Sequence, residues 1–343
     1  MKKFFVSLVM LLSLSAANVF AQSSLIATLS HEGEVSMFYG ASALQQAHEA
    51  AAHGDVITLS SGTFTSVNIS KAITLRGAGM DTDVTTNTFP TIIAGDFFIC
   101  ICDTVTAKLT IEGIYHNQRI IIDQTPTLNC SLTNATFLRC RLNDFGFSYV
   151  PVLTNVKFVH CKIENLDLGQ IASTNSTLSF INSYVCSPST RSSSTVTMEF
   201  TNCILAYYRA NFSVSSIGSA ILKNCIIRGV TGEEGYYGAY SYLTTAYNCI
   251  SVSCGPNPWK DMTNNTNHVA NFNEVFSNWD TFELTDEAKT KYLGLDGTEV
   301  GIYGGNFPFD PKTSAPQITK FNVAAKSTVD GKLSVDIEVK GVE

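Results

Sequence analysis

The chain has 343 residues, of which 22 are Lys or Arg and 29 are Asp or Glu, giving a net charge of −7. Charged residues make up 15% of the chain, against about 25% in typical soluble proteins, whereas 21 Phe and 13 Tyr supply a large core. The acidic balance and scattered Lys and Arg residues argue against a nucleic-acid partner, because phosphate binding needs a basic surface. The aromatic content argues against disorder.

Residues 1–21 have the pattern of an export signal. Lys2 and Lys3 precede an apolar run over residues 4–14, and Val19-Phe20-Ala21 resembles a cleavage site. The run is shorter than the roughly 20 residues that cross a bilayer. We therefore expect cleavage and no later membrane span. The mature chain would be periplasmic, cell-surface or extracellular, and its 20 basic and 29 acidic residues would give a net charge of −9.

A four-residue phrase recurs at intervals of 21, 22, 20, 22 and 24 residues. Its copies are Phe137-Leu138-Arg139-Cys140, Phe158-Val159-His160-Cys161, Phe180-Ile181-Asn182-Ser183, Phe200-Thr201-Asn202-Cys203, Leu222-Lys223-Asn224-Cys225 and Ala246-Tyr247-Asn248-Cys249. Such a regular period predicts a solenoid built from coils of roughly 22 residues.

The alternation within each copy predicts which side chains face the core. Apolar residues stand five and three positions before the final Cys or Ser, and again two positions after it, so one strand precedes a bend and a second follows it. The residue at the bend is Asn in four copies, and Asn tolerates the left-handed backbone that a sharp bend needs. We expect two stacked rows, one of asparagines and one of inward cysteines: Asn182, Asn202, Asn224, Asn248, Cys140, Cys161, Cys203, Cys225 and Cys249.

These rows resemble the asparagine ladder of the pectin-lyase-like superfamily, whose fold is a right-handed parallel β-helix. The N-terminal part is similar too: Ser42 and Gln45 form a capping-box pattern, and Gly54 would end a helix over about 42–53 that caps the apolar column. The phrases at 282–285, 292–305 and 331–339 resemble the C-terminal part of secreted β-helix proteins of gut-type Gram-negative bacteria. The resemblance implies a β-helix over 22–312 with a C-terminal capping region from about 255. From about Thr313 the pattern changes, and the alternating apolar residues Leu333, Val335, Ile337 and Val339 predict a β-strand appendage over 313–343.

Ten Cys in an exported chain raise the alternative of a disulfide framework. Inward cysteines one coil apart have Cβ atoms about 4.8 Å apart, wider than a disulfide prefers, so we expect free buried thiols in the row. Cys249 with Cys254, and Cys130 with Cys186, remain alternatives for pairing. Cys100 and Cys102 are expected to pack on one face of a strand rather than to bind a metal.

Ionisable and aromatic residues soon after the bend would line one outer groove of the solenoid. Aromatic faces beside hydrogen-bonding groups suit sugar rings, so we expect binding by Asp144, Tyr207, Tyr208, Tyr236 and Tyr237. Eliminative cleavage of a uronic-acid polymer would need an Arg base and a cation such as Ca²⁺, for which the candidates are Glu164, Asp167, Arg209 and Arg228. Each of these charges could also simply be a solvated surface group.

Three hypotheses on function remain open after the sequence. The leading one is an exported β-helix that binds a polysaccharide, a surface glycan or another surface polymer along its outer groove. The second is a polysaccharide lyase that acts on uronic-acid polymers with Ca²⁺, and the third is a structural or adhesive surface protein. The motifs of polygalacturonases and of many pectate lyases do not occur in the sequence, so enzyme status stays open.

Overall fold

A computed structural model of the chain describes residues 25–85, 88–101, 107–122, 132–147, 153–167, 176–186, 188–189, 196–206, 219–229, 243–253, 259, 266–314, 317–323, 331–332 and 334–340. These residues form a parallel β-solenoid of about six turns, which confirms the fold class that the repeat predicts. The predicted signal segment lies outside them. Within the described ranges, no helix is long and apolar enough to cross a bilayer.

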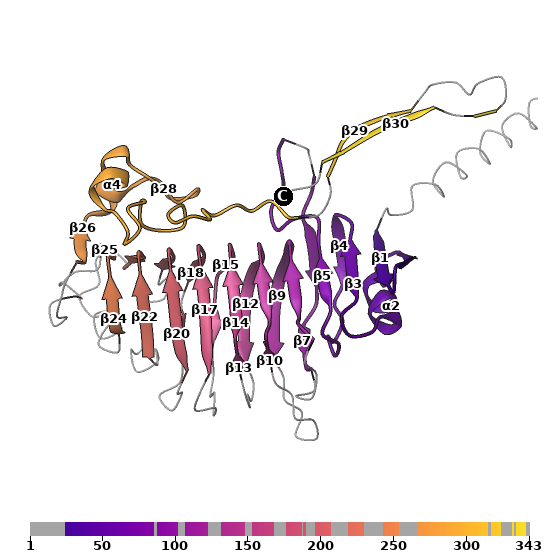
Figure 1. Cartoon of the computed structure of the whole chain (residues 1–343), viewed down its shortest axis with the longest axis horizontal. Coiled ribbons are helices and arrows are strands. Elements are labelled where there is room, and N and C mark those ends of the chain that lie inside the picture. Colours follow the sequence, from indigo (N-terminus) through magenta and orange to yellow (C-terminus); the bar gives the residue numbers. More distant parts are fainter. Residues whose placement is uncertain are drawn as a thin grey trace, which may run out of the picture.

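Two long sheets run along the solenoid (Figure 1). The first sheet has the order β2-β1-β3-β5-β8-β11-β14-β17-β20-β22-β24. In that order its strands are Glu34–Tyr39, Ile26–His31, Val56–Leu59, Thr74–Arg76, Thr110–Glu112, Thr136–Leu138, Val156–Val159, Thr177–Ile181, Thr197–Thr201, Ser219–Lys223 and Leu243–Tyr247. The pairs β1–β2 and β1–β3 are antiparallel, and the later neighbours are parallel.

The second sheet follows the bends, and its main path is β26-β25-β23-β21-β18-β15-β12-β9-β6-β4. In that order its strands are His268–Ala270, Ile250–Val252, Ile226–Arg228, Ile204–Ala206, Tyr184–Cys186, Lys162–Ile163, Arg141–Phe147, Ile114–Ile122, Thr91–Ala94 and Gly62–Thr65. Shorter strands extend it: β7 (Phe97–Ile99) pairs β9, while β16 (Leu166–Asp167) pairs β12 and β19 (Pro188–Ser189). Strands β10 (Leu132–Thr133) and β13 (Leu153–Thr154) form a separate parallel pair.

The predicted bends are present in all six copies of the phrase. Backbone φ is positive, between 44° and 56°, at Arg139, His160, Asn182, Asn202, Asn224 and Asn248. Because φ is positive at Arg139 and His160 as well, the bend does not depend on Asn. The residues expected to face inward on either side of it are buried, as Leu178, Phe180 and Val185 show in one coil.

A stack of Phe rings fills the middle of the core. Phe137, Phe158, Phe180 and Phe200 occupy equivalent positions on neighbouring strands, with ring centroids 4.7 to 4.9 Å apart and interplanar angles of 8° to 12°. The edges of the Phe137 and Phe158 rings also meet Phe145. Stacked aromatic rings contribute beyond the area they bury, so this stack ties four coils together.

The inward thiols have a hydrogen-bonding role that the sequence did not reveal. The thiols of Cys140, Cys161, Cys203 and Cys225 each lie 3.3 to 3.4 Å from a backbone carbonyl oxygen of the preceding coil. Ser183 takes the same place in its coil, and its hydroxyl lies 3.4 Å from the Phe158 carbonyl oxygen. A weak S–H donor therefore satisfies carbonyl groups at the bend.

The cysteine states correct three expectations. Cys186 and Cys249 are buried thiols rather than disulfide-bonded cysteines, which excludes the Cys130–Cys186 and Cys249–Cys254 pairs. Cys100 is disulfide-bonded, with its partner outside the described residues, so core packing as a thiol was the wrong expectation there. Cys100 is only half-buried at the end of β7, where a bridge meets fewer constraints than inside the stacked row.

We expect thiol titration to separate the two kinds of cysteine. Burial raises the pKa of Cys140, Cys203 and Cys249, so these thiols should stay protonated and unreactive toward a disulfide reagent in the native protein at neutral pH. Under denaturing, non-reducing conditions at least six thiols should titrate. Fewer than six, or rapid reaction in the native state, would contradict the buried row.

An N-terminal cap covers the first coil. Helix α2 (Ala43–Ala50) buries Ala43, Leu44 and Ala47, as its spacing predicts, but it ends before Gly54. The predicted capping box is wrong: Ser42 is the N-cap, yet its side chain makes no capping hydrogen bond. At the C-terminal end of the helix, the ammonium of Lys71 donates to three carbonyl oxygens within residues 48–51.

The C-terminal residues pack on the outside of the second sheet. They form α3 (Phe272–Val275), β27 (Phe276–Asn278), β28 (Glu283–Leu284) and α4 (Asp286–Lys291). These elements build a second apolar cluster with outward side chains of the solenoid, among them Tyr184, Ile204, Ile226 and Ile250. The predicted β appendage follows as an antiparallel hairpin of β29 (Gln317–Val323) and β30 (Val335–Lys340).

Candidate functional site

Residues 292–314, called the strap here, run back along one edge of the solenoid from its C-terminal coils toward its N-terminal coils (Figure 1). The strap lies over the bends. Asn248 Nδ2 donates to the Leu293 carbonyl at 2.8 Å, the Leu295 N–H donates to Asn224 Oδ1 at 2.9 Å, and Asn182 Nδ2 donates to the carbonyls of Ile302 and Gly304.

This contact corrects the expected asparagine ladder. The side chains of Asn182, Asn224 and Asn248 bond backbone groups of the strap rather than one another. Asn-to-Asn bonding does occur at another bend, where Asn155 Nδ2 donates to Asn134 Oδ1 at 2.7 Å. Bend residues of the later coils therefore hold the strap.

Glycines in the phrase 292–305 allow this close approach. A Cβ on Gly294 would lie 2.8 Å from the Asn224 amide, and one on Gly301 would lie 2.9 Å from Ile226 Cδ1. Gly305 has φ of +81° and would meet Asn202. The glycines of this phrase are thus explained by close packing of the strap backbone against residues at and beside the bends.

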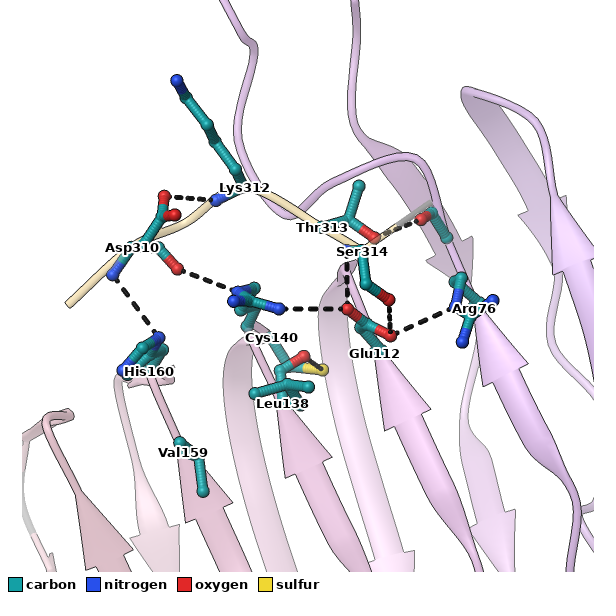
Figure 2. Close-up of polar contacts among 12 residues, drawn as sticks. Arg76, Glu112, Leu138, Cys140, Val159, His160, Asp310, Lys312, Thr313 and Ser314 are labelled. Carbon is teal, nitrogen blue, oxygen red and sulfur yellow. Dashed lines mark hydrogen bonds and ion pairs between the residues drawn. The ribbon is translucent and has the colours of Figure 1, made fainter. Parts of the chain in front are cut away.

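The strap ends at a buried carboxylate (Figure 2). Glu112 is 2% exposed and accepts hydrogen bonds from the Ser314 N–H and Oγ, both at 2.7 Å, from Arg76 Nε at 3.2 Å and from Arg139 Nη1 at 3.3 Å. Burial alone would raise the pKa of Glu112, but the hydrogen bonds from Ser314 and Arg76 outweigh it and hold the pKa below its usual value. The charged carboxylate therefore fastens the strap.

The C-terminal elements α3 to α4 cover one part of the outer face of the second sheet and leave another part open. On β18, β21, β23 and β25, the outward side chains of Tyr184, Ile204, Ile226 and Ile250 are buried under the C-terminal elements. On the three preceding strands of the sheet order, the equivalent outward side chains remain partly exposed: Tyr115, Arg141 and Lys162. We call these three side chains the basic row.

The basic row combines an aromatic ring with two cations. Arg141 lies over the Tyr115 ring, 5.1 Å from its centroid. Asp81, from the loop after β5, accepts from Lys162 Nζ at 2.8 Å and from Arg141 Nη1 at 3.5 Å. One carboxylate therefore serves two cations, which leaves the row with a positive balance.

A cavity of about 170 Å³ adjoins the row. Its walls are the loop residues Ala78, Gly79 and 81–84 on one side and the strap residues Pro311, Lys312 and Thr313 on the other. Asp81 lines the cavity and pairs with both cations of the basic row, so it connects the cavity to the row. The cavity lining holds two carboxylates, Asp81 and Asp83, and one ammonium, Lys312, so an anionic ligand would bind at the cations of the basic row rather than inside the cavity.

The sequence-predicted groove residues are only partly brought together. Asp144 lies beside Arg119, with 4.0 Å between Oδ2 and Nε, on the strands that also hold Arg141 and Tyr115. Glu164 and Asp167 are half-buried near β15 and β16. Arg209, Tyr207, Tyr208, Tyr236 and Tyr237 lie outside the described residues.

Arg228 lies apart from these carboxylates, under the C-terminal cap. Its guanidinium lies 4.0 Å from the Trp279 ring centroid and 4.8 Å from that of Phe272. Such cation–π packing holds the guanidinium against the two rings. To act as a base, Arg228 would have to leave both rings.

The residues of the basic row were not predicted from the sequence. The predicted charged residues lie three to six positions after the inward Cys, whereas Arg141 and Lys162 directly follow Cys140 and Cys161. Strand alternation makes this first offset outward-facing, so it could have been found. Asp81 could not have been found in this way, because it lies roughly 60 to 80 residues before Arg141 and Lys162 in the sequence and reaches them only through the folded loop.

Across the ranges that the structure describes, no group of three or more His, Cys, Asp and Glu side chains is placed to hold a metal ion. Ca²⁺ binding by Glu164 and Asp167 stays a prediction. Comparison with known proteins adds no assignment: no family, curated protein or solved structure matches the chain.

Proposed function

We propose that the protein binds an acidic carbohydrate polymer on the outer face of the second sheet, at the basic row. The observation that supports this most directly is the alignment of Tyr115, Arg141 and Lys162 on adjacent parallel strands. Guanidinium and ammonium groups donate strong hydrogen bonds to carboxylates, and an aromatic ring offers an apolar face to a sugar ring. A solenoid presents such groups in a line, which suits an extended chain.

Asp81 fits this proposal as an internal substitute for the ligand. Its carboxylate occupies the position between Lys162 and Arg141 that a uronate carboxylate of the polymer would take. The carboxylate of Asp81 and that of the ligand would then compete for the same two donors. Removal of the Asp81 charge should therefore strengthen binding rather than weaken it.

Binding can be measured by isothermal titration against polygalacturonate, with its fully methyl-esterified form as the uncharged counterpart. We expect the acidic polymer alone to bind. The double substitution Arg141→Ala with Lys162→Ala should weaken it by about tenfold or more, because charge-assisted hydrogen bonds are lost. Asp81→Asn should tighten binding several-fold, and added salt should weaken it.

Lys157→Ala provides the matched control, because Lys157 is an exposed cation on β14 of the other sheet. It should leave the affinity unchanged. Equal binding of both polymer forms, or a loss confined to a Tyr207/Tyr208/Tyr236/Tyr237 alanine variant, would show that the basic row is not the site. No binding across other acidic polysaccharides would refute the function itself.

We also propose that the chain belongs with the pectin-lyase-like superfamily and is exported. Parallel coils, the helix at the N-terminal end and the positive-φ asparagines support the first proposal. The lyase hypothesis, with Glu164, Asp167, Arg209 and Arg228 as its residues, is checked in the same samples. Ca²⁺-dependent formation of unsaturated sugars would establish cleavage, and a surface adhesin would instead bind a protein without need of sugar.

A further inference from the structure

Two strands expose rows of apolar side chains that their surroundings do not cover. On β2, Val35, Met37 and Tyr39 are between 55% and 66% exposed. On β30, Val335, Ile337 and Val339 are between 47% and 58% exposed. In each strand the three residues alternate, so they lie on one face. The two rows therefore match in length and spacing.

Both strands also have an open edge. Among the strands of the described residues, β2 is the terminal strand of the first sheet and pairs with β1 alone. β30 pairs with β29 in a sheet of two strands. An exposed apolar edge strand is a template for further pairing, and an isolated two-stranded hairpin is only marginally stable in water. Each strand could thus pair with the open edge of the other and cover its apolar row.

We propose that β30 of a second copy of this chain pairs antiparallel with β2. In the register that aligns the two apolar rows, Val335 faces Tyr39, Ile337 faces Met37 and Val339 faces Val35. The added strand pairs would continue the first sheet into the hairpin.

The position of the two strands makes the exchange reciprocal. The strap returns the chain to the N-terminal coils, where Ser314 is held by Glu112, and the hairpin leaves the body at the end of the solenoid that also holds β2 (Figure 1). Donor and acceptor therefore lie at the same end of each molecule. Two copies that exchange hairpins close as a two-fold dimer and leave neither edge open.

The oligomeric state of the full chain tests this proposal, by light scattering over a range of concentrations. We expect a dimer. Met37→Glu and Ile337→Lys should each raise its dissociation constant by about tenfold or more, because a charge is placed against an apolar side chain. Combined in one chain, the two substitutions face each other as opposite charges, and the dimer should return. Phe89→Lys, which changes an exposed apolar residue elsewhere, should have no effect.

Disulfide trapping distinguishes a second copy from the hairpin of the same chain. The variant with Met37→Cys and Ile337→Cys should give a covalently linked dimer under oxidising conditions, while the native buried thiols stay unreactive. A monomeric chain, a disulfide formed within one molecule, or a dimer that is sensitive to Ile337→Lys but not to Met37→Glu would overturn the proposal. Polymer binding is independent of these outcomes.

Discussion

Glu112→Ala is expected to destabilise the protein by about 3 kcal/mol, because it removes a buried carboxylate that holds two partly buried guanidinium groups. Arg76 and Arg139 would both lose the carboxylate, and the Ser314 N–H and Oγ would lose their acceptor. Urea unfolding measures the loss. Protease digestion under native conditions should in addition cut near residues 312–320 sooner, because Ser314 no longer fastens the strap.

Lys289→Ala is the control for an ion pair at the surface. Lys289 Nζ lies 3.8 Å from Glu283 and 3.7 Å from Asp286, and all three side chains are about a third exposed or more. Its removal should cost less than about 1 kcal/mol. A Glu112→Ala variant as stable as Lys289→Ala would show that the strap is fastened elsewhere.

Acid should weaken the same contact. The pKa of Glu112 is lowered in the folded state from an ordinary value of 4.5, so its stabilisation is complete above pH 4.5 and is lost as the pH falls through the folded pKa. Burial lowers the pKa of His160 from 6.5, which penalises the folded state as the pH falls below 6.5. Glu112→Gln removes the titrating carboxylate but keeps His160. The unfolding free energy of this variant should depend less on pH below 4.5 than that of the unsubstituted protein.

The sequence predicted the solenoid because its evidence repeats. Each coil has the same alternation of apolar residues around a bend, so a copy that departs from the pattern can still be assigned from the others. The bend itself is local, and positive φ at Arg139 and His160 shows that coil geometry imposes it even without Asn. Fold class and inward residues thus follow from short-range rules.

The strap contacts were beyond those rules. The Asn row suggests stacking between neighbours, yet Asn182 and Asn224 bond residues about 70 to 120 positions later. Likewise Asp81 reaches Lys162 only through the loop after β5. Such long-range pairs leave no period in the sequence, which is why the cover of the bends and the centre of the candidate site became visible only in the structure.

Phe158→Ala is expected to cost about 3–5 kcal/mol, because it removes a fully buried ring and leaves a cavity. Phe158 stacks between Phe137 and Phe180 and meets the edge of Phe145, so several coil-to-coil contacts are lost at once. Urea unfolding should show this loss. In a solenoid, where each coil contacts its neighbours, a weakened middle coil should also reduce the cooperativity of unfolding.

Leucine substitutions test whether stacking or simple burial matters. Leu222 occupies the same position next to Phe200, so the column accepts Leu. Phe158→Leu should cost about 1 kcal/mol more than Phe200→Leu, because Phe158 has stacked rings on both sides and Phe200 has one only. Equal losses at the two positions would mean that area alone sets the stability of the column, and that the aligned rings add nothing to the hold between coils.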